Sequence, residues 1–229
     1  MRNDKAQVLG QIRVALQTAQ LPAARATVPG RFVVREGDRA ALIDNFRREL
    51  EPIGGLSYLA HNDEEAIDII LNLLRPLDNK ELLMWDESEI PVRGIGEALR
   101  ASGYTRDQIE MPLDGAQRKT KLMELANASA GITGAMAGMA DTGSLALVSS
   151  ASHPRLASLL PPTHIAVLST AKLFPNLASF FVAHPDIMRD ASNFVLVTGP
   201  SRTADIELTL QRGVHGPKFL HVVLLGTDQ

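Results

Sequence analysis

Polar side chains that could do chemistry are concentrated near the end of the chain. The segment GPSRTADIELTLQRGVHGP, residues 199–217, lies between the apolar runs 194–197 and 219–225. These runs predict two buried strands. Gly199 and Pro200 predict a turn after the first strand, because Gly permits backbone shapes closed to other residues and Pro fixes φ. The segment is either the ordinary connection between two strands or one rim of a site.

A short helix is expected after this turn, with Ser201 or Thr203 as its N-cap. The free N–H groups at such a helix start favour an anion. In the alternative interpretation, Asp205 and Glu207 only complement the dipole of a capped helix. His215 lies in a Gly-flanked turn, and it is the best histidine candidate for acid–base chemistry or anion binding.

A second candidate is the turn Asp141-Thr142-Gly143, which follows the small-residue segment 131–140. So many small residues let a backbone or a ligand approach closely. The alternative is an Asx-turn that leads into a strand. An aspartic protease is excluded, because the Asp-Thr-Gly sequence occurs once and no second motif completes the carboxylate pair.

The third candidate region contains Arg155 and His164. Arg155 precedes a predicted helix and could hold a carboxylate or phosphate through two hydrogen bonds. His164 lies at the start of a predicted strand, where a structural histidine is the more common interpretation. The six histidines show no metal-ligand spacing, so no metal site is predicted.

Alternating strands and helices must position these residues. Strands are predicted at 56–60, 82–85, 109–112, from about 143, at 164–169, 194–197 and 218–225, and helices at 64–74, 92–101, 116–128, 154–160 and 171–182, with a tight small-residue helix inside 130–142. Two further helices, 5–20 and 38–50, come before the first strand. This order predicts an α/β fold with a mostly parallel sheet flanked by helices. An N-terminal helical arm, 1–38, would precede the α/β domain, 39–229.

Composition narrows the classes of function. The 229 residues carry a net charge of -3 and no clustered basic stripe, which argues against nucleic-acid binding. The chain has no cysteine, so it cannot hold a disulfide, a thiolate nucleophile or a cysteine-ligated iron–sulfur cluster. Neither a nucleotide-binding Gly motif nor a membrane-spanning apolar run is present. The N-terminus lacks the features of a secretory signal, and a cytoplasmic protein is expected.

Three segments together resemble the LUD-domain family, in particular its lactate-utilisation C group. They are GITGAMAGMADTGSLALVSS (131–150), PRLASLLPPTHIAVL (154–168) and GPSRTADIELTLQRGVHGP (199–217). The resemblance is strong over about 120–226 and looser over 39–119. In the second half of the first segment, Asp141 stands where many family members have Glu.

The resemblance implies a fold like that of the phosphosugar isomerase, deaminase and CoA-transferase superfamily. It also implies a role in bacterial oxidation of lactate to pyruvate, beside partner proteins that carry the iron–sulfur clusters. It also favours the interpretation of residues 199–217 as one rim of a site rather than as an ordinary connection between two strands. The positions carried over from the family are Asp141, Thr142, Gly143, Arg155, His164, Gly199, Ser201, Thr203, Asp205, Glu207, His215 and Gly216.

Two functional hypotheses follow, beside a purely structural role. In the first, the chain is a non-redox subunit that binds a small carboxylate or phosphorylated ligand, or docks the cluster-bearing partners. Arg155 and the helix start at Ser201 would then hold the anion, with Asp205 and His215 orienting it. In the second, the chain is itself an isomerase or a CoA- or acyl-transferase, with Asp205 or Glu207 as base or nucleophile and His215 as acid.

Overall fold

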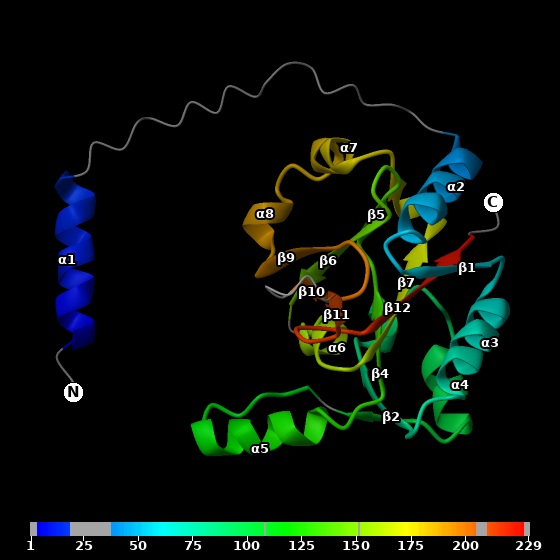
Figure 1. Cartoon of the computed structure of the whole chain (residues 1–229), viewed down its shortest axis with the longest axis horizontal. Helices are drawn as coiled ribbons and strands as arrows, with labels where there is room; N and C mark the ends of the chain where they lie inside the picture. Colours follow the sequence, from blue (N-terminus) through cyan, green and yellow to red (C-terminus); the bar gives the residue numbers. More distant parts are fainter. Residues whose placement is uncertain (1–3, 19–37, 108, 151, 205–209, 227–229) are drawn as a thin grey trace. The chain divides into compact units, whose positions relative to one another are not determined.

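The computed structural model describes residues 4–18, 38–107, 109–150, 152–204 and 210–226 (Figure 1). Contacts divide the chain into two units, Met1–Phe32 and Val33–Gln229. The described part of the first unit is helix α1 (Asp4–Thr18), whose apolar side chains are exposed. The predicted boundary between an arm and a domain after residue 38 stays a prediction. Among the described helices, none has the length and apolar character needed to cross a membrane.

A six-stranded parallel sheet forms the centre of the second unit. Its strands, in spatial order, are β1 (Leu56–Ala60), β12 (Phe219–Leu225), β7 (Thr163–Ser169), β4 (Ala130–Gly134), β2 (Glu81–Met84) and β3 (Thr105–Asp107). Every neighbouring pair is parallel. All residues of β4 and β7 are buried, as expected for strands covered on both faces. The predicted α/β class is confirmed.

Helices cover the sheet because their apolar residues recur at helical spacing. The helices packed around this sheet are α2 (Arg39–Leu50), α3 (Asp63–Leu74), α4 (Ile95–Ala101) and α6 (Leu156–Leu159). Helix α5 (Gly115–Leu125) precedes β4 and buries only its last residue, Leu125. In α3, Ala66, Ile70 and Leu74 follow one another at four-residue intervals and are buried. The Asn62 side chain caps this helix by accepting the Glu65 N–H. Helices α3 and α4 lie on one side of the sheet, and α6 on the other (Figure 1).

A second sheet of four strands was not expected. It comprises β8 (Leu173–Phe174), β5 (Ala137–Met139), β6 (Ser144–Ser149) and β9 (Asn193–Val197), and its β5–β6 and β6–β9 pairs are antiparallel. Helix α7 (Leu177–Ala183) brings Phe180 into a small core with Ala137, Met139 and Ala146. The short helices η2 (Thr170–Lys172) and α8 (Ile187–Asp190) complete this region.

Two helix predictions near this sheet are wrong. The small-residue helix inside 130–142 is instead the end of β4 followed by β5. Its small residues let other backbone segments lie directly against the strands; a Cβ on Gly131 would collide with the carbonyl oxygen of Ala157. The helix predicted at 171–182 begins only at Leu177, because η2 and β8 occupy its first half.

The helix start predicted at Ser201 or Thr203 is also wrong, while residues 205–209 of that predicted helix lie outside the described residues. Arg202–Ala204 forms strand β10, which pairs with β11 (Leu210–Arg212) in an antiparallel ladder. Thr203 therefore lies opposite Gln211 and caps no helix. Asp205 and Glu207 lie outside the described residues. The strand predicted at 109–112 is displaced to β3, whose place in the ladder is set by its pairing with Glu81–Leu83 of β2.

The connections that follow β2 and β4 leave the carboxyl edge of the sheet in different directions. From β2 the chain passes through the short helix η1 (Glu87–Glu89) and α4 to the edge strand β3. From β4 it leaves in the opposite direction, through the second sheet and α6 to β7. The connections after two adjacent strands thus diverge. In open α/β sheets, ligands bind in the crevice at such a point.

Candidate functional site

The crevice beyond β2 and β4 is bordered by two loops. The backbone N–H of Trp85 donates to the carbonyl of Ile132, at 3.1 Å, which extends the pairing of β2 with β4. The loop between β6 and α6 then crosses this end of β2. The Asp86 N–H donates to the Ser152 carbonyl at 3.3 Å, and the Trp85 indole N–H donates to the Pro154 carbonyl at 3.3 Å.

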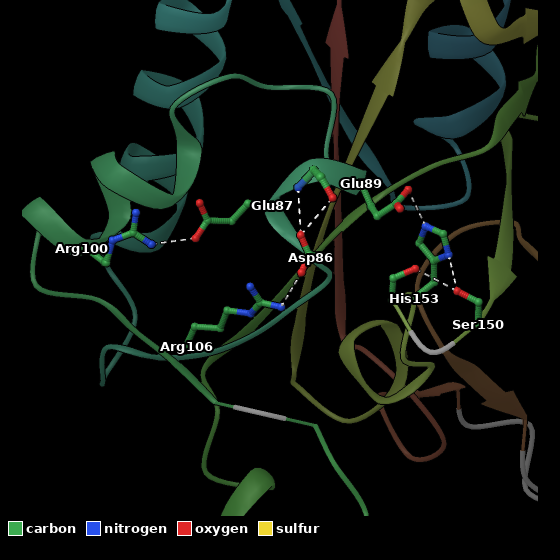
Figure 2. A network of polar contacts seen from close by, with 9 residues as sticks. Asp86, Glu87, Glu89, Arg100, Arg106, Ser150 and His153 are labelled. Carbon is green, nitrogen blue, oxygen red and sulfur yellow. Dashed lines mark hydrogen bonds and ion pairs between the residues drawn. The ribbon is translucent and has the colours of Figure 1, made fainter.

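Asp86 organises the first turn of η1. Its carboxylate accepts the Ser88 N–H at 3.2 Å and the Ser88 hydroxyl at 3.0 Å. These hydrogen bonds to Ser88, assisted by the nearby charge of Arg106, lower the pKa of Asp86. Asp86 is therefore anionic over the physiological pH range. Its Oδ2 atom lies 3.9 Å from Nη2 of Arg106, a loose ion pair (Figure 2).

Two glycines make room for the acidic side of η1. Gly134, the last residue of β4, lies against the carbonyl oxygen of Glu89, and a Cβ there would collide with that oxygen. A Cβ on Gly96 would likewise occupy the space of the Glu87 carboxylate. Glu87 instead pairs with Arg100 of α4, at 2.7 Å. The position of η1 thus depends on the absence of side chains on its neighbours.

A serine, a histidine and a glutamate form a continuous hydrogen-bonded chain across the two loops (Figure 2). The Ser150 hydroxyl lies 2.7 Å from His153 Nδ1, and His153 Nε2 lies 2.9 Å from Glu89 Oε2. The Ser152 hydroxyl lies 3.1 Å from that of Ser150. The Trp85 ring packs on the imidazole edge to face, with centroids 4.4 Å apart. Glu89 can hold the Nε2 proton, which leaves Nδ1 free to accept the serine proton.

A cavity of about 430 Å³ adjoins this chain. Ser152, which bonds to Ser150, is one of its lining residues. The full lining comprises Met84, Asp86, Arg106, Ile109, Glu110, Ser152 and Pro154. The cavity thus combines apolar walls with one guanidinium, from Arg106, and two carboxylates, from Asp86 and Glu110. A larger cavity, of about 1190 Å³, lies on the other side of η1, where Asp63 holds Arg93 at 2.7 Å.

Most of the predicted site residues lie elsewhere, where β1, β7 and β12 begin. The Ser201 N–H donates to the Pro217 carbonyl at 2.9 Å, and the Lys218 N–H donates to the Pro162 carbonyl at 2.8 Å. This places Ser201 and its neighbour Gly216 at the amino edge of the parallel sheet. His215, in the same turn, is exposed. This edge is opposite to the one where α/β sheets collect ligands.

The Asp141-Thr142-Gly143 turn lies close to the predicted Gly199 turn. Ser144 links them, because its hydroxyl lies 2.9 Å from that of Thr142 and 2.6 Å from that of Thr198. Gly143 has φ +62° and touches the backbone of Leu50, while Gly199 has φ +91° and touches Ile53. The structure therefore brings these two predicted turns together around the connection between α2 and β1.

The other predicted residues are separate from this group. His164 is buried in β7, with its Nε2 atom 2.9 Å from the Thr133 hydroxyl. Burial, assisted by the charge of His221, lowers the pKa of His164 from 6.5 to about 4. His164 is thus neutral at pH 7. Arg155 stands exposed at the start of α6, next to Pro154 of the carboxyl-edge cavity.

The sequence analysis did not select Glu89, Arg106, Ser150 or His153 as site residues. A Ser-His pair in a loop between a strand and a helix was the available signal for Ser150 and His153. Glu89, however, is 64 positions from His153 in the chain. No local pattern indicates that these two residues meet, because their contact depends on the order of strands in the sheet.

Comparison with known proteins places the chain among related sequences. A sequence model described as "LUD domain" matches residues 43–225. An uncharacterised protein of Neisseria meningitidis is 39% identical over 44% of each chain. Lactate utilization protein C of Macrococcus caseolyticus is 35% identical, covering 69% of this chain and 67% of its own. Lactate utilization protein C of Halalkalibacterium halodurans is 29% identical, covering 67% of this chain and 65% of its own. The matches thus span two thirds or less of these relatives.

One solved structure shares the fold. It is a DUF162 family protein from Deinococcus radiodurans, 22% identical, with a TM-score of 0.58. The similarity covers 83% of this chain and 100% of the other. The arrangement of strands and helices described above is therefore that of an experimentally determined fold.

Proposed function

Because the chain belongs to the LUD domain family, we propose that it takes part in bacterial lactate utilisation. In this proposal it is a cytoplasmic, non-redox subunit in the oxidation of lactate to pyruvate, beside partner proteins that carry iron–sulfur clusters. Its own task is to bind the small carboxylate. The lactate-utilisation proteins among its relatives support this pathway.

The guanidinium of Arg106 in the carboxyl-edge cavity is the observation that carries the ligand proposal. Its ion pair with Asp86 is long, at 3.9 Å, so a tighter carboxylate partner can displace it. Met84 and Ile109 supply apolar walls beside it. Two carboxylates, Asp86 and Glu110, also line the cavity. A two- or three-carbon acid would therefore take the place of Asp86 at the Arg106 guanidinium.

The composition supports the non-redox role. Removing two electrons from lactate requires an acceptor, such as a dinucleotide, flavin or metal cluster. With no cysteine in its sequence, this chain cannot ligate an iron–sulfur cluster through thiolates. Partner proteins would therefore supply the clusters.

Titration of the purified chain with lactate and with pyruvate tests the ligand proposal. We expect Arg106→Ala to weaken binding by about tenfold or more, because a charge-assisted hydrogen bond contributes about 1.5–3 kcal/mol. Arg93→Ala is the matched control, since Arg93 lines the other cavity and its side chain is 96% exposed. Equal affinity of the Arg106→Ala and wild-type chains would contradict the proposal. Loss of binding in Arg155→Ala alone would move the ligand to the start of α6.

The role in the cell is tested with the same variants. Deleting the gene should slow growth on lactate as sole carbon source, and a wild-type copy should restore it. An Arg106→Ala copy should restore growth less well than an Arg93→Ala copy. Unchanged growth of the deletion strain on lactate would remove this chain from lactate utilisation.

The alternative of a stand-alone isomerase or CoA-type transferase stays a prediction, as does the likeness to the phosphosugar isomerase and CoA-transferase superfamily. Its proposed acid and bases, His215, Asp205 and Glu207, also remain proposals. His215 is exposed in a turn at the amino edge of the sheet. Asp205 and Glu207 lie outside the described residues.

A further inference from the structure

We propose that Ser150 is a nucleophile, activated by His153 and Glu89, in an acyl-transfer site at the carboxyl edge of the sheet. Its substrates would be small esters or thioesters whose acyl part carries a carboxylate. The position of that carboxylate, on Arg106, rests on the proposed function; the nucleophile itself does not.

The hydrogen-bonded chain provides the geometry that nucleophilic catalysis needs. A serine hydroxyl is a weak nucleophile until an adjacent base accepts its proton. His153 Nδ1 lies 2.7 Å from the Ser150 hydroxyl, within the range for direct proton transfer. Glu89, at 2.9 Å from Nε2, fixes the tautomer and stabilises the imidazolium that forms. Glu89 is a positioning residue, because it contacts the base rather than the reacting atoms.

The surroundings hold the base in one orientation while leaving the nucleophile accessible. The His153 ring packs against Trp85, and its side chain is 22% exposed. Ser150 is exposed at the crevice. Ser150 thus lies at the topological switch point, where ligands bind in open α/β sheets.

The adjoining cavity determines the class of acyl group. Ser152 belongs to both features, because it lines the 430 Å³ cavity and its hydroxyl lies 3.1 Å from that of Ser150. An acyl group whose carbonyl lies at Ser150 can therefore extend past Ser152 toward Arg106. The Ser152 hydroxyl is also placed to donate to the oxygen that becomes negative during attack.

The reaction proceeds in two steps and involves no oxidation or reduction. Ser150 Oγ forms a bond to the acyl carbon, the bond to the alkoxide or thiolate leaving group breaks, and His153 transfers the serine proton to that group. Water then attacks the acyl-serine. A new carbon–oxygen bond forms, the bond to Oγ breaks, and one water proton returns through His153 to Ser150, releasing the free acid.

Labelling of the full-length protein with a small, neutral alkyl fluorophosphonate tests the nucleophile. Serine attack forms an Oγ–P bond and expels fluoride, and the site is identified by mass spectrometry of peptides. We expect one label, on Ser150. It should be absent in Ser150→Ala and unchanged in Ser158→Ala, a serine of α6 outside the site. His153→Gln should lower the labelling rate by about 100-fold or more, in a chain whose circular dichroism and melting curve match the wild type.

Two substitutions distinguish positioning by Glu89 from mere support of the loop. Glu89→Gln should lower the labelling rate, because a neutral amide does not stabilise the imidazolium that forms during attack. Glu89→Asp, which keeps the carboxylate, should recover part of that rate. Glu89 bonds to His153 directly, while Asp86 and Arg106 line the neighbouring cavity. Equal labelling rates in Glu89→Gln and the wild type would remove Glu89 from the mechanism.

Protection by succinate tests the substrate class. Succinate is the product released from a succinyl thioester. Adding succinate should slow the labelling of the wild type but should have no effect on the labelling rate of Arg106→Gln. No protection would overturn the carboxylate-bearing class. No label, a label on another residue, or equal rates in wild type and His153→Gln would overturn the nucleophile. Failure of lactate titration with intact Ser150 labelling would reject only the proposed function.

Discussion

At the residue scale, the histidines of this chain divide by environment. His164 is enclosed in a strand that is buried along its full length, and it satisfies its ring nitrogen with Thr133. His153 lies at the crevice between a serine and a glutamate. Burial makes His164 a structural residue, because an imidazole that resists protonation in a closed core cannot exchange protons with a ligand. The hydroxyl and carboxylate on either side of His153 suit it for that exchange.

We predict that His164 makes the protein less stable as the pH falls from about 6.5 to 4. The folded-state pKa of about 4 is below the value of 6.5 for an exposed histidine, so the unfolded state binds the proton more readily. Stability from this residue is fully present above pH 6.5 and is lost toward pH 4. The whole effect is on the order of 3 kcal/mol. Urea unfolding at several pH values measures it.

His164→Gln isolates this residue from the carboxylates that titrate in the same range. The variant keeps a polar partner for Thr133 but has no titrating group, so its stability should fall less than that of wild type between pH 6.5 and 4.5. His215→Gln, at an exposed position, should follow the wild type. If the free energy of unfolding changed with pH equally in wild type and His164→Gln, His164 would not be the source of the pH dependence.

At the scale of elements, η1 depends on a glycine in the neighbouring strand. Gly134 ends β4, and the Glu89 carbonyl of η1 lies where its Cβ would be. Because that neighbour is backbone, it cannot move aside as a flexible side chain would. The spacing between β4 and η1 therefore sets the position of Glu89 relative to His153.

Gly134→Ala should lower the free energy of unfolding by about 1–3 kcal/mol, the usual effect of overpacking a filled site. It should also slow the labelling of Ser150, since Glu89 moves with its backbone. Gly115→Ala is the matched control, because a Cβ at the start of α5 meets no atom within 4 Å. That variant should be neutral or slightly more stable, as alanine favours helix. Similar effects of the two substitutions on urea unfolding would contradict this account.

At the scale of the whole molecule, both sheets and their cores are built from residues 42–225. The site also lies within this part, because its residues belong to the loops after β2 and β6. All of these residues belong to the second of the two units, Val33–Gln229. Folding of the α/β domain should therefore need no contribution from the predicted arm.

We expect a chain reduced to residues 39–229 to unfold cooperatively, with a melting temperature within about 2 °C of that of the full chain. A change of 1 kcal/mol in stability shifts the melting temperature of a domain of this size by about 2–4 °C. Calorimetry of the two forms measures this difference. The truncated form keeps Arg39, which donates to the Thr170 carbonyl at 2.6 Å. A markedly lower midpoint would show that residues 1–38 belong to the folded domain.

The sequence alone determined the class of fold and several of its turns. The pattern of apolar residues within a strand or helix depends on which of its faces is buried. The regular alternation of apolar runs with amphipathic segments therefore made the parallel sheet and helices such as α3 predictable. Gly143 and Gly199 were also predictable as turns, and both adopt positive φ. The lack of cysteine excluded thiolate chemistry without any structure.

Only the tertiary structure decided which loops meet. The segment after Pro200 has helix-like spacing, but β10 and β11 pair with each other on either side of it, and this strand pairing overrides the weak helical preference at Arg202–Ala204. The predicted residues lie largely at the amino edge of the sheet, whereas Glu89 and His153 meet at its carboxyl edge. That meeting follows from β2 and β4 being neighbours, although they are separated in the chain by β3 and α5. Strand order is a property of the whole packed sheet, which no local pattern of residues specifies.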